Sequence, residues 1–158
     1  MAEKTNASRI LERLGIKFEL IEYKVDPQHL DAGHVAQELG QDIATVFKTL
    51  VLHGDKTGHF VCVIQGDKEV DLKKAAKISN NKKAAMIPMK ELLPLTGYIR
   101  GGCTAIGMKK QFPVFLDQKA LEQPFIHISA GKRGLQIKLN PEDYIKATSA
   151  SIGDIITD

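Results

Sequence analysis

A single charged residue, Lys48, interrupts an apolar stretch and is the first candidate for chemistry in this chain. Residues 46–52 are mostly β-branched, apolar or aromatic, which predicts a strand. Strand side chains alternate between two faces, so Lys48 shares its face with Val46, Leu50 and Leu52. An ammonium group there extends to water, pairs with an anion inside the fold, or serves a ligand.

Two glycine-containing segments are the next candidates. Residues 96–107 include the pair Gly101-Gly102, and residues 129–134 form a second turn that begins at Ser129 and contains Gly131. Such loops present backbone N–H groups to a carbonyl or phosphate oxygen, or they only allow tight turns. Both interpretations stay open at this point.

A nucleophile of the protein itself is not favoured. Ser129 and Thr49 carry hydroxyls, but no Ser-His-Asp arrangement can be recognised around them. Cys103 follows the glycine pair in a loop and could be exposed, yet no histidine is placed to activate it. Tyr23 ends a predicted strand, and it is either a half-buried aromatic residue at the rim of the core or a residue of the functional site.

Known cofactor motifs are absent from the sequence. It contains no P-loop, no G-x-G-x-x-G and no standard zinc-ligand spacing. The five histidines are His29, His34, His53, His59 and His127. We therefore expect neither a metal nor another cofactor.

The distribution of charge says more than the net charge of +3. Basic residues gather between positions 68 and 83 and in two loop pairs. The residues expected to contact a phosphate backbone are Lys73, Lys74, Lys77, Lys109, Lys110, Lys132 and Arg133. They form either solvated faces or a track for a phosphate backbone, and three separate clusters make the anionic partner plausible.

Length and composition indicate one globular domain in the cytoplasm. A chain of 158 residues with 43% apolar residues can bury a core without disulfides. No apolar run reaches the roughly 20 residues of a membrane span, and residues 1–6 lack an export signal. We therefore expect no membrane partner and two free thiols, Cys62 and Cys103.

The predicted elements alternate without a strict βαβ order. Helices or helical turns are expected at 5–14, 31–39, 71–78, 89–93, 118–122 and 140–148, and strands at 18–23, 46–52, 59–65, 84–87, 114–116, 125–129 and 135–139. Asp31, Asp71 and Asn140 are the expected N-caps of their helices, and Gly40 is expected to end the helix that Asp31 begins. We predict an α+β fold: a single domain with a curved, mixed, barrel-like β-sheet surrounded by helices.

Five segments of the chain resemble the YbaK/EbsC family, free-standing relatives of the editing domain inserted in bacterial prolyl-tRNA synthetase. They are residues 18–27 with Tyr23, 46–50, 71–76, 96–102 and 129–135. The match runs nearly end to end, so residues 1–158 are identified as one YbaK/aminoacyl-tRNA synthetase-associated editing domain.

The resemblance implies a deacylase that clears mischarged Cys-tRNA(Pro). Lys48 matches the key lysine of the family. The substrate-binding positions implied in this chain are Tyr23, Thr49, Gly101, Gly102, Ser129, Gly131 and Gln136. The implied partners are tRNA(Pro) and, as an optional source of tRNA selectivity, prolyl-tRNA synthetase; no DNA and no cofactor are implied.

Departures from the family pattern leave the amino-acid specificity open. Gln136 stands where many relatives carry Asp, Ala130 where Gly is common, and Cys103-Thr104-Ala105 where an apolar-Ser-Pro run is usual. Two alternatives remain: a water-based deacylase for Ala-tRNA(Pro) or another small mischarged amino acid, and a non-catalytic module that binds tRNA ends or nucleotides.

Overall fold

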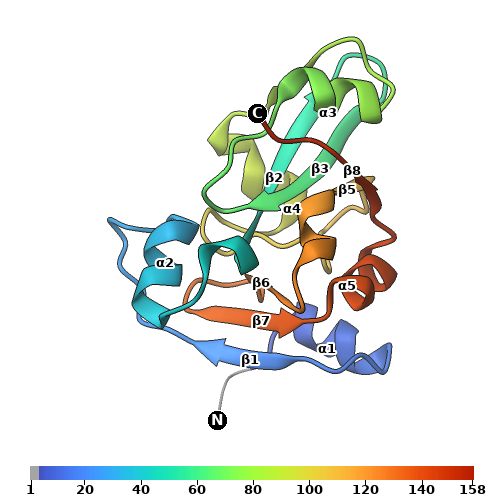
Figure 1. Cartoon of the computed structure of the whole chain (residues 1–158). Coiled ribbons are helices and arrows are strands. Elements are labelled where there is room, and N and C mark those ends of the chain that lie inside the picture. Colours follow the sequence, from blue (N-terminus) through green and yellow to red (C-terminus); the bar gives the residue numbers. More distant parts are fainter. Residues whose placement is uncertain (1–3) are drawn as a thin grey trace.

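Two sheets carry the fold in the computed structural model, which describes residues 4–158 (Figure 1). The smaller sheet is antiparallel, in the order β1 (Glu19–Glu22), β7 (Leu135–Leu139), β6 (Ile126–Ser129). The larger sheet is mixed, in the order β4 (Ala84–Met86), β2 (Phe47–Gly54), β3 (Gly58–Gln65), β5 (Val114–Asp117), β8 (Ser151–Gly153). A bridge between Val46 and His127 joins the two sheets where β2 begins.

Helices connect and cover these strands, and local capping sets where most of them begin. The helices are α1 (Asn6–Arg13), α2 (Ala32–Leu39), α3 (Leu72–Ile78), α4 (Leu92–Thr96) and α5 (Pro141–Thr148). The predicted caps Asp31, Asp71 and Asn140 each accept a backbone N–H in the first helical turn. Gly40 ends α2 in the left-handed conformation, as its position predicts.

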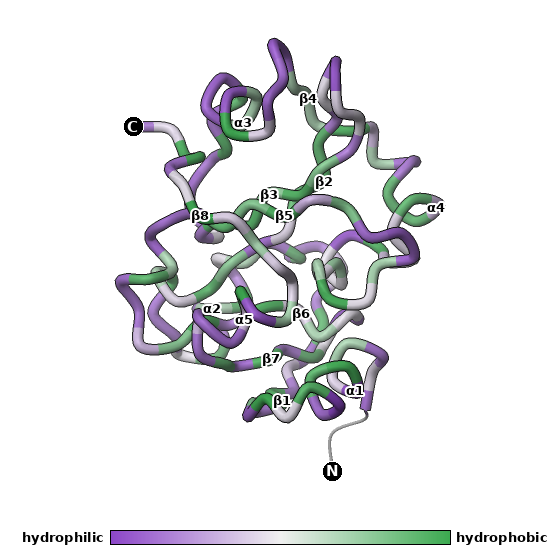
Figure 2. Tube along the Cα trace, turned by 90° about the vertical axis from the view of Figure 1, so that its right-hand side faces the viewer, coloured by the Kyte–Doolittle hydropathy of each residue, from purple (hydrophilic) through white to green (hydrophobic). Residues whose placement is uncertain are grey.

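The central hairpin of β2 and β3 separates two apolar cores. Phe47 and Val51 belong to the larger core, which also contains the inner faces of β6 and β7. Leu50 and Leu52 pack in the smaller core on the other face, beneath α3. Figure 2 shows these central strands as mainly hydrophobic segments. The alternation read from the sequence thus holds, and it places Lys48 on the face of Leu50 and Leu52.

One edge of β2 is open where the site lies. β4 pairs only with Leu52–Gly54, and the N–H of Ile87 donates to the carbonyl of Val51 at 3.3 Å. Among residues 4–158, no strand of the larger sheet continues this edge toward Thr49. Thr49 shares the backbone orientation of Val51, so its N–H and carbonyl point to the same open side.

The structure confirms the single-domain α+β fold, with corrections in detail. The sheets are curved but do not close into a barrel within the described residues. The helical turn predicted at 89–93 is a 3₁₀ turn (Met89–Glu91) followed by α4, which runs through Pro94. Pro94 is tolerated because N–H groups in a first helical turn need no intrahelical partner. The short strand β8 was not predicted.

No helix of residues 4–158 combines the length and the apolarity that crossing a bilayer requires. The predicted absence of an export signal concerns residues 1–6, of which the first three lie outside the described residues.

Candidate active site

A cavity of about 340 Å³ opens at the unpaired edge of β2. It is lined by β2, by the start of α2, by the glycine loop after α4, and by β6 and β7. Six of the eight residues predicted to be catalytic or substrate-binding line this cavity: Tyr23, Lys48, Thr49, Gly101, Ser129 and Gln136. Residues more than 100 positions apart in the sequence therefore meet in one pocket large enough for a small organic group.

Lys48 lies in this pocket wall, and no residue between 4 and 158 provides a counterion for it. Its side chain is half-buried, and within residues 4–158 its ammonium group has no ion pair or hydrogen bond. Burial lowers the pKa of Lys48, although the more distant carboxylates of Glu69, Asp67 and Asp31 act in the opposite direction. Of the three uses considered for this lysine, an internal ion pair is therefore excluded for the described residues.

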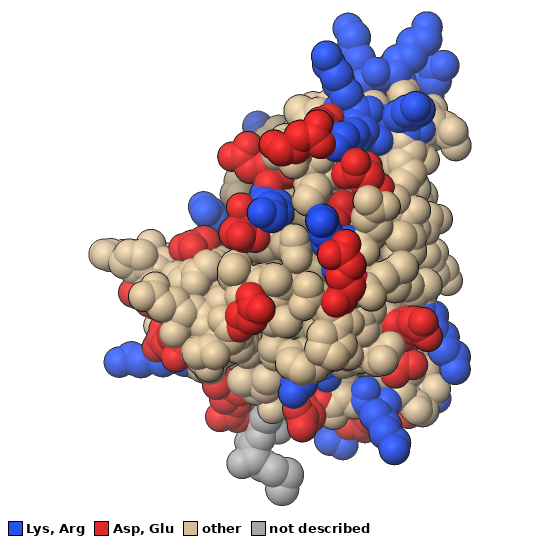
Figure 3. Space-filling model, viewed as in Figure 1, with Lys and Arg blue, Asp and Glu red and all other residues tan. Residues whose placement is uncertain are grey.

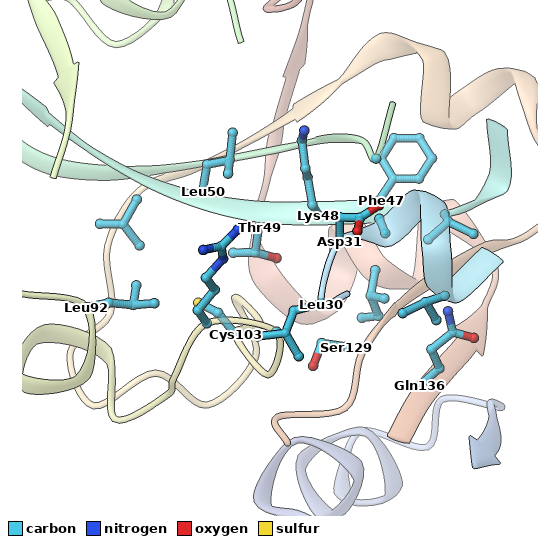
Figure 4. A pocket seen from close by; sticks show the side chains of 18 of the residues that line it. Leu30, Asp31, Phe47, Lys48, Thr49, Leu50, Leu92, Cys103, Ser129 and Gln136 are labelled. Atoms are coloured by element: carbon cyan, nitrogen blue, oxygen red, sulfur yellow. The ribbon is translucent and has the colours of Figure 1, made fainter. Parts of the chain in front are cut away.

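Lys48 and Thr49 approach the pocket from opposite faces of β2. Figure 4 shows Lys48 and Leu50 leaving the strand on one side and Thr49 on the other, the side where Ser129 and Gln136 also lie. Only at the open edge can a bound group contact both side chains. The edge of β2, more than either face, therefore organises the site.

The two glycine-containing loops are stacked against each other. Gly102 is buried, and a Cβ atom added there would lie 3.0 Å from Lys132 Cα. Arg133 Nε donates to the carbonyl of Arg100 at 2.8 Å. Only Gly101 of the glycine pair lines the cavity. Gly102 therefore allows close packing of the loops, which differs from the substrate contact predicted for it.

Gly131 also lies behind the pocket wall. It adopts φ +100°, and a Cβ atom added there would meet the ring of Tyr98 at 3.0 Å. Its N–H donates to Ser129 Oγ at 3.2 Å. Gly131 therefore acts on the pocket indirectly, because it orients the hydroxyl of Ser129.

The floor of the pocket is polar but carries no carboxylate. Gln136 is buried and exchanges two hydrogen bonds with Gln41, at 2.8 and 3.2 Å. His127 lies within 2.9 Å of Thr45 Oγ1, and burial lowers the pKa of its imidazole, which favours the neutral form. The acidic group of the pocket is Asp31 instead, whose Oδ2 accepts the N–H of His34 at 3.0 Å.

Sequence reasoning missed three polar or charged lining residues and left the exposure of a fourth residue open. Asp31, Arg100 and His127 line the cavity, but the sequence marked only Asp31, as a helix cap. Cys103 also lines the cavity and is buried, which answers the question of exposure that the sequence left open. Burial raises the pKa of the Cys103 thiol to about 12, so this thiol stays protonated near neutral pH.

The basic residues divide into a remote group and a group beside the pocket. Lys73 and Lys77 are exposed on α3, and Figure 3 shows lysines gathered at that end of the molecule. Lys109 and Lys110 are exposed in the loop before β5. Lys132 and Arg133 pack against the glycine pair next to the cavity.

Lys74 is a correction among the predicted tRNA contacts. Its ammonium group donates to Asp154 and Asp158, both at 3.0 Å, and to the carbonyl of Ile156 at 2.9 Å. These partners come from the C-terminal segment, which no local pattern connects with α3. Lys74 therefore fastens the C-terminal segment to the helix, and its ammonium group already has three acceptors within the fold.

The chain is similar in sequence to aminoacyl-tRNA editing proteins. Residues 26–147 match the model of the family described as "Aminoacyl-tRNA editing domain". A protein of Enterococcus faecalis, named "Putative Cys-tRNA(Pro)/Cys-tRNA(Cys) deacylase EbsC", is 48% identical over 155 residues. The alignment covers 98% of this chain and 94% of that protein.

Two solved structures share the fold at low sequence identity. The first is described as "Crystal structure of a putative trans-editing enzyme for prolyl tRNA synthetase" and superposes with a TM-score of 0.84 at 24% identity, over 99% of this chain and all of the other. The second, a hypothetical protein designated APE2540, gives a TM-score of 0.88 at 19% identity, over 97% of this chain and 100% of the other.

Proposed function

Because this chain belongs to the aminoacyl-tRNA editing domain family, we propose that it is a free-standing deacylase that removes cysteine from mischarged tRNA(Pro). The relative that is 48% identical carries the name of such an activity. The single structural observation that supports the proposal is the ammonium group of Lys48, half-buried in the pocket wall with no counterion in residues 4–158. A desolvated charge without a partner disfavours folding, so a bound anionic group is its natural complement.

Lys48 acts as the electrostatic element of the reaction. Its ammonium group binds the terminal adenosine end of the tRNA and the negative charge that develops on the ester. The N–H of Thr49 at the open edge and the backbone of Gly101 are further donors toward the same space. One donor aimed at a developing oxyanion contributes roughly 10²–10³ in rate.

The substrate supplies its own nucleophile. The thiol sulfur of the cysteinyl group attacks its ester carbonyl, the carbon–oxygen bond to the ribose breaks, and the thiol proton passes to the leaving 3′ oxygen. Water then opens the cyclic thioester. Well-oriented intramolecular attack reaches effective molarities of about 10⁵ M or more. This route agrees with the state of Cys103, whose buried thiol is held protonated.

Substrate-assisted attack also addresses selectivity. A pocket alone separates side chains that differ by one small group by only about 1–3 kcal/mol. Alanine has no thiol, so Ala-tRNA(Pro) lacks the attacking group and is not deacylated by this route even if it binds in the pocket. Gln136 on the pocket floor offers an amide, which does not pair with a positively charged α-amino group as a carboxylate does. Asp31 also lines the pocket, and its carboxylate would receive the α-amino group of the substrate in its place.

The tRNA body is held by the exposed basic residues. Lys73, Lys77, Lys109 and Lys110 contact phosphates, while Lys132 and Arg133 act close to the acceptor end. Prolyl-tRNA synthetase is the partner that would add selectivity for tRNA(Pro), and the cytoplasm is the compartment in which such tRNA is found.

A deacylation panel tests the proposal. Cys-tRNA(Pro), Ala-tRNA(Pro) and Ser-tRNA(Pro) are each incubated with excess wild-type protein, Lys48→Ala and Lys83→Ala, and ester loss is followed over time. We expect fast loss of cysteine only, at least about 10²-fold slower loss with Lys48→Ala, and no change with Lys83→Ala, whose side chain is exposed and remote.

Other outcomes point to the alternatives. Equal rates on the three substrates would indicate attack by water and overturn the thiol mechanism. Binding with a strong salt dependence but no ester loss in a single turnover would indicate a non-catalytic tRNA-binding module. Full activity of Lys48→Ala would overturn the role of Lys48.

A further inference from the structure

Four side chains with metal-binding donor atoms gather beside the pocket, outside the proposed reaction. They form the His-carboxylate cluster: Asp26, His29, His34 and Glu38. One donor atom from each of Asp26, His29 and His34 lies within 4.8 Å of the other two. His34 Nε2 lies 3.5 Å from Glu38 Oε2. The rings of His29 and His34 stack with centroids 4.7 Å apart, so the two imidazoles are direct neighbours.

The backbone around the cluster is held by hydrogen bonds. The N–H of His29 donates to the carbonyl of Asp26 at 2.9 Å, which closes a tight turn. The N–H of Gln28 donates to Asp26 Oδ1 at 3.0 Å, and this bond leaves Oδ2 directed at His29 Nδ1, 2.8 Å away. His34 and Glu38 are four residues apart on α2 and therefore share one face of the helix.

We propose that Asp26, His29 and His34 bind one Zn²⁺ ion, with Glu38 or water as the fourth ligand. Two imidazoles with carboxylates suit zinc better than calcium or magnesium, which prefer all-oxygen sites. Tetrahedral zinc with bonds of about 2.0–2.1 Å separates its ligands by about 3.4 Å. Small rotations of these partly exposed side chains bring the three donor atoms from within 4.8 Å to that spacing.

This proposal departs from the sequence-based expectation of no metal. The spacing Asp-x₂-His-x₄-His-x₃-Glu matches no standard zinc motif. These four side chains become possible ligands of one ion only because the turn at residues 26–29 and the helix α2 pack against each other.

The ion would connect to the pocket through the chain between its ligands. Leu30 and Asp31 lie between His29 and His34 and line the cavity. Asp31 accepts the N–H of His34, so the metal ligand and the pocket carboxylate are tied by one hydrogen bond. Zinc would therefore hold residues 26–34 in place and position Asp31 without taking part in the chemistry.

Metal titration of the full chain tests the site. Chelator-treated protein is titrated with ZnCl₂ by calorimetry and with CoCl₂ by visible absorption, which reports tetrahedral coordination. We expect one ion per chain, an intense Co²⁺ visible band, and a Tm raised by roughly 5–10 °C when free zinc is about a hundredfold above its Kd. His29→Asn and His34→Gln should each weaken binding by at least about tenfold.

A second pair of histidines provides the matched control. The rings of His53 and His59 lie 4.9 Å apart on the β2–β3 hairpin, away from the cluster. The double variant His53→Gln/His59→Gln should bind zinc as the wild type does. Asp26→Asn adds a variant that keeps the Oδ1 bond of the turn, and circular dichroism verifies the fold of every variant. Unsaturable binding, a Co²⁺ spectrum without the tetrahedral band, or affinity unchanged in the folded His29→Asn and His34→Gln variants would overturn the proposal.

Discussion

Two lysine-bearing regions of the molecule differ in how they treat positive charge. At the open edge of β2, Lys48 is alone, half-buried and without an anionic partner in residues 4–158. At the far end, α3 and the neighbouring turn carry several exposed lysines (Figure 3), while the partly buried Lys74 of the same helix is paired with Asp154 and Asp158. The region with the most lysines is therefore not the region where a single lysine is expected to bind an anion most strongly.

The difference follows from the dielectric surroundings. An exposed ammonium keeps its hydration, is screened by salt and contributes little to any single contact. A half-buried ammonium has lost part of its hydration, and its pKa falls accordingly. The exposed region suits reversible binding of a polyanion through many weak contacts, whereas Lys48 suits one strong interaction with a localised charge.

Among variants that keep the positive charge, the largest expected effect is slower deacylation by Lys48→Arg. The planar guanidinium group is larger than an ammonium group and does not fit the same space in the pocket wall. We therefore expect the single-turnover rate of Lys48→Arg to be about 10–100-fold lower than that of the wild type. Lys73→Arg, on the exposed face of α3, should react at the wild-type rate. A Lys48→Arg variant as fast as the wild type would remove the distinction between the two regions.

The same pair of proteins gives a pH test. Burial lowers the pKa of Lys48, so its ammonium group loses its proton at a lower pH than an exposed lysine does. Arginine stays charged throughout this range. The ratio of wild-type rate to Lys48→Arg rate should therefore fall as the pH rises through the lowered pKa, and a ratio that stays constant would argue against a charged Lys48 in the reaction.

The next effect is on tRNA binding. Replacing Lys73, Lys77, Lys109 and Lys110 together by Gln should weaken binding about tenfold near 0.1 M salt and lower the slope of log K against log salt by up to about 3. The single-turnover rate at saturating protein should stay unchanged. Filter binding at several salt concentrations measures the slope. A slope equal to that of the wild type would show that these lysines do not contact tRNA phosphates.

A smaller effect is expected for Lys74. Lys74→Met keeps the side-chain stem and removes three hydrogen bonds to the C-terminal segment, so we expect a Tm lower by about 1–3 °C. Added salt should narrow the difference, because the ion pairs are exposed. Thermal unfolding at low and high salt measures the change in Tm and its dependence on salt. Weaker tRNA binding by Lys74→Met with an unchanged Tm would instead indicate that Lys74 contacts the tRNA.

The smallest effect concerns the pocket thiol. Burial raises the pKa of Cys103 to about 12, as it does for Cys62, so iodoacetamide at pH 8 should label neither residue in the folded protein. Both should react after denaturation, which serves as the internal control. Rapid labelling of Cys103 in the folded state would reopen the possibility of a protein nucleophile.

The sequence was informative wherever the deciding interaction is local. Asp31, Asp71 and Asn140 were recognised as caps because a capping hydrogen bond spans only two or three residues. The β2–β3 hairpin and the face of Lys48 followed from alternation around a turn. The order of motifs carried the family resemblance, and the family match over residues 26–147 agrees with it.

Only the tertiary structure decided which groups remain without partners. Lys74 found its anions 80 and 84 residues away, Cys103 was buried, and Asp31 was turned into the pocket as well as capping α2. Lys48 was left alone because no carboxylate of the described chain was brought within contact of it. Burial and pairing of charges depend on strand register and on distant segments, and no local pattern encodes those distances.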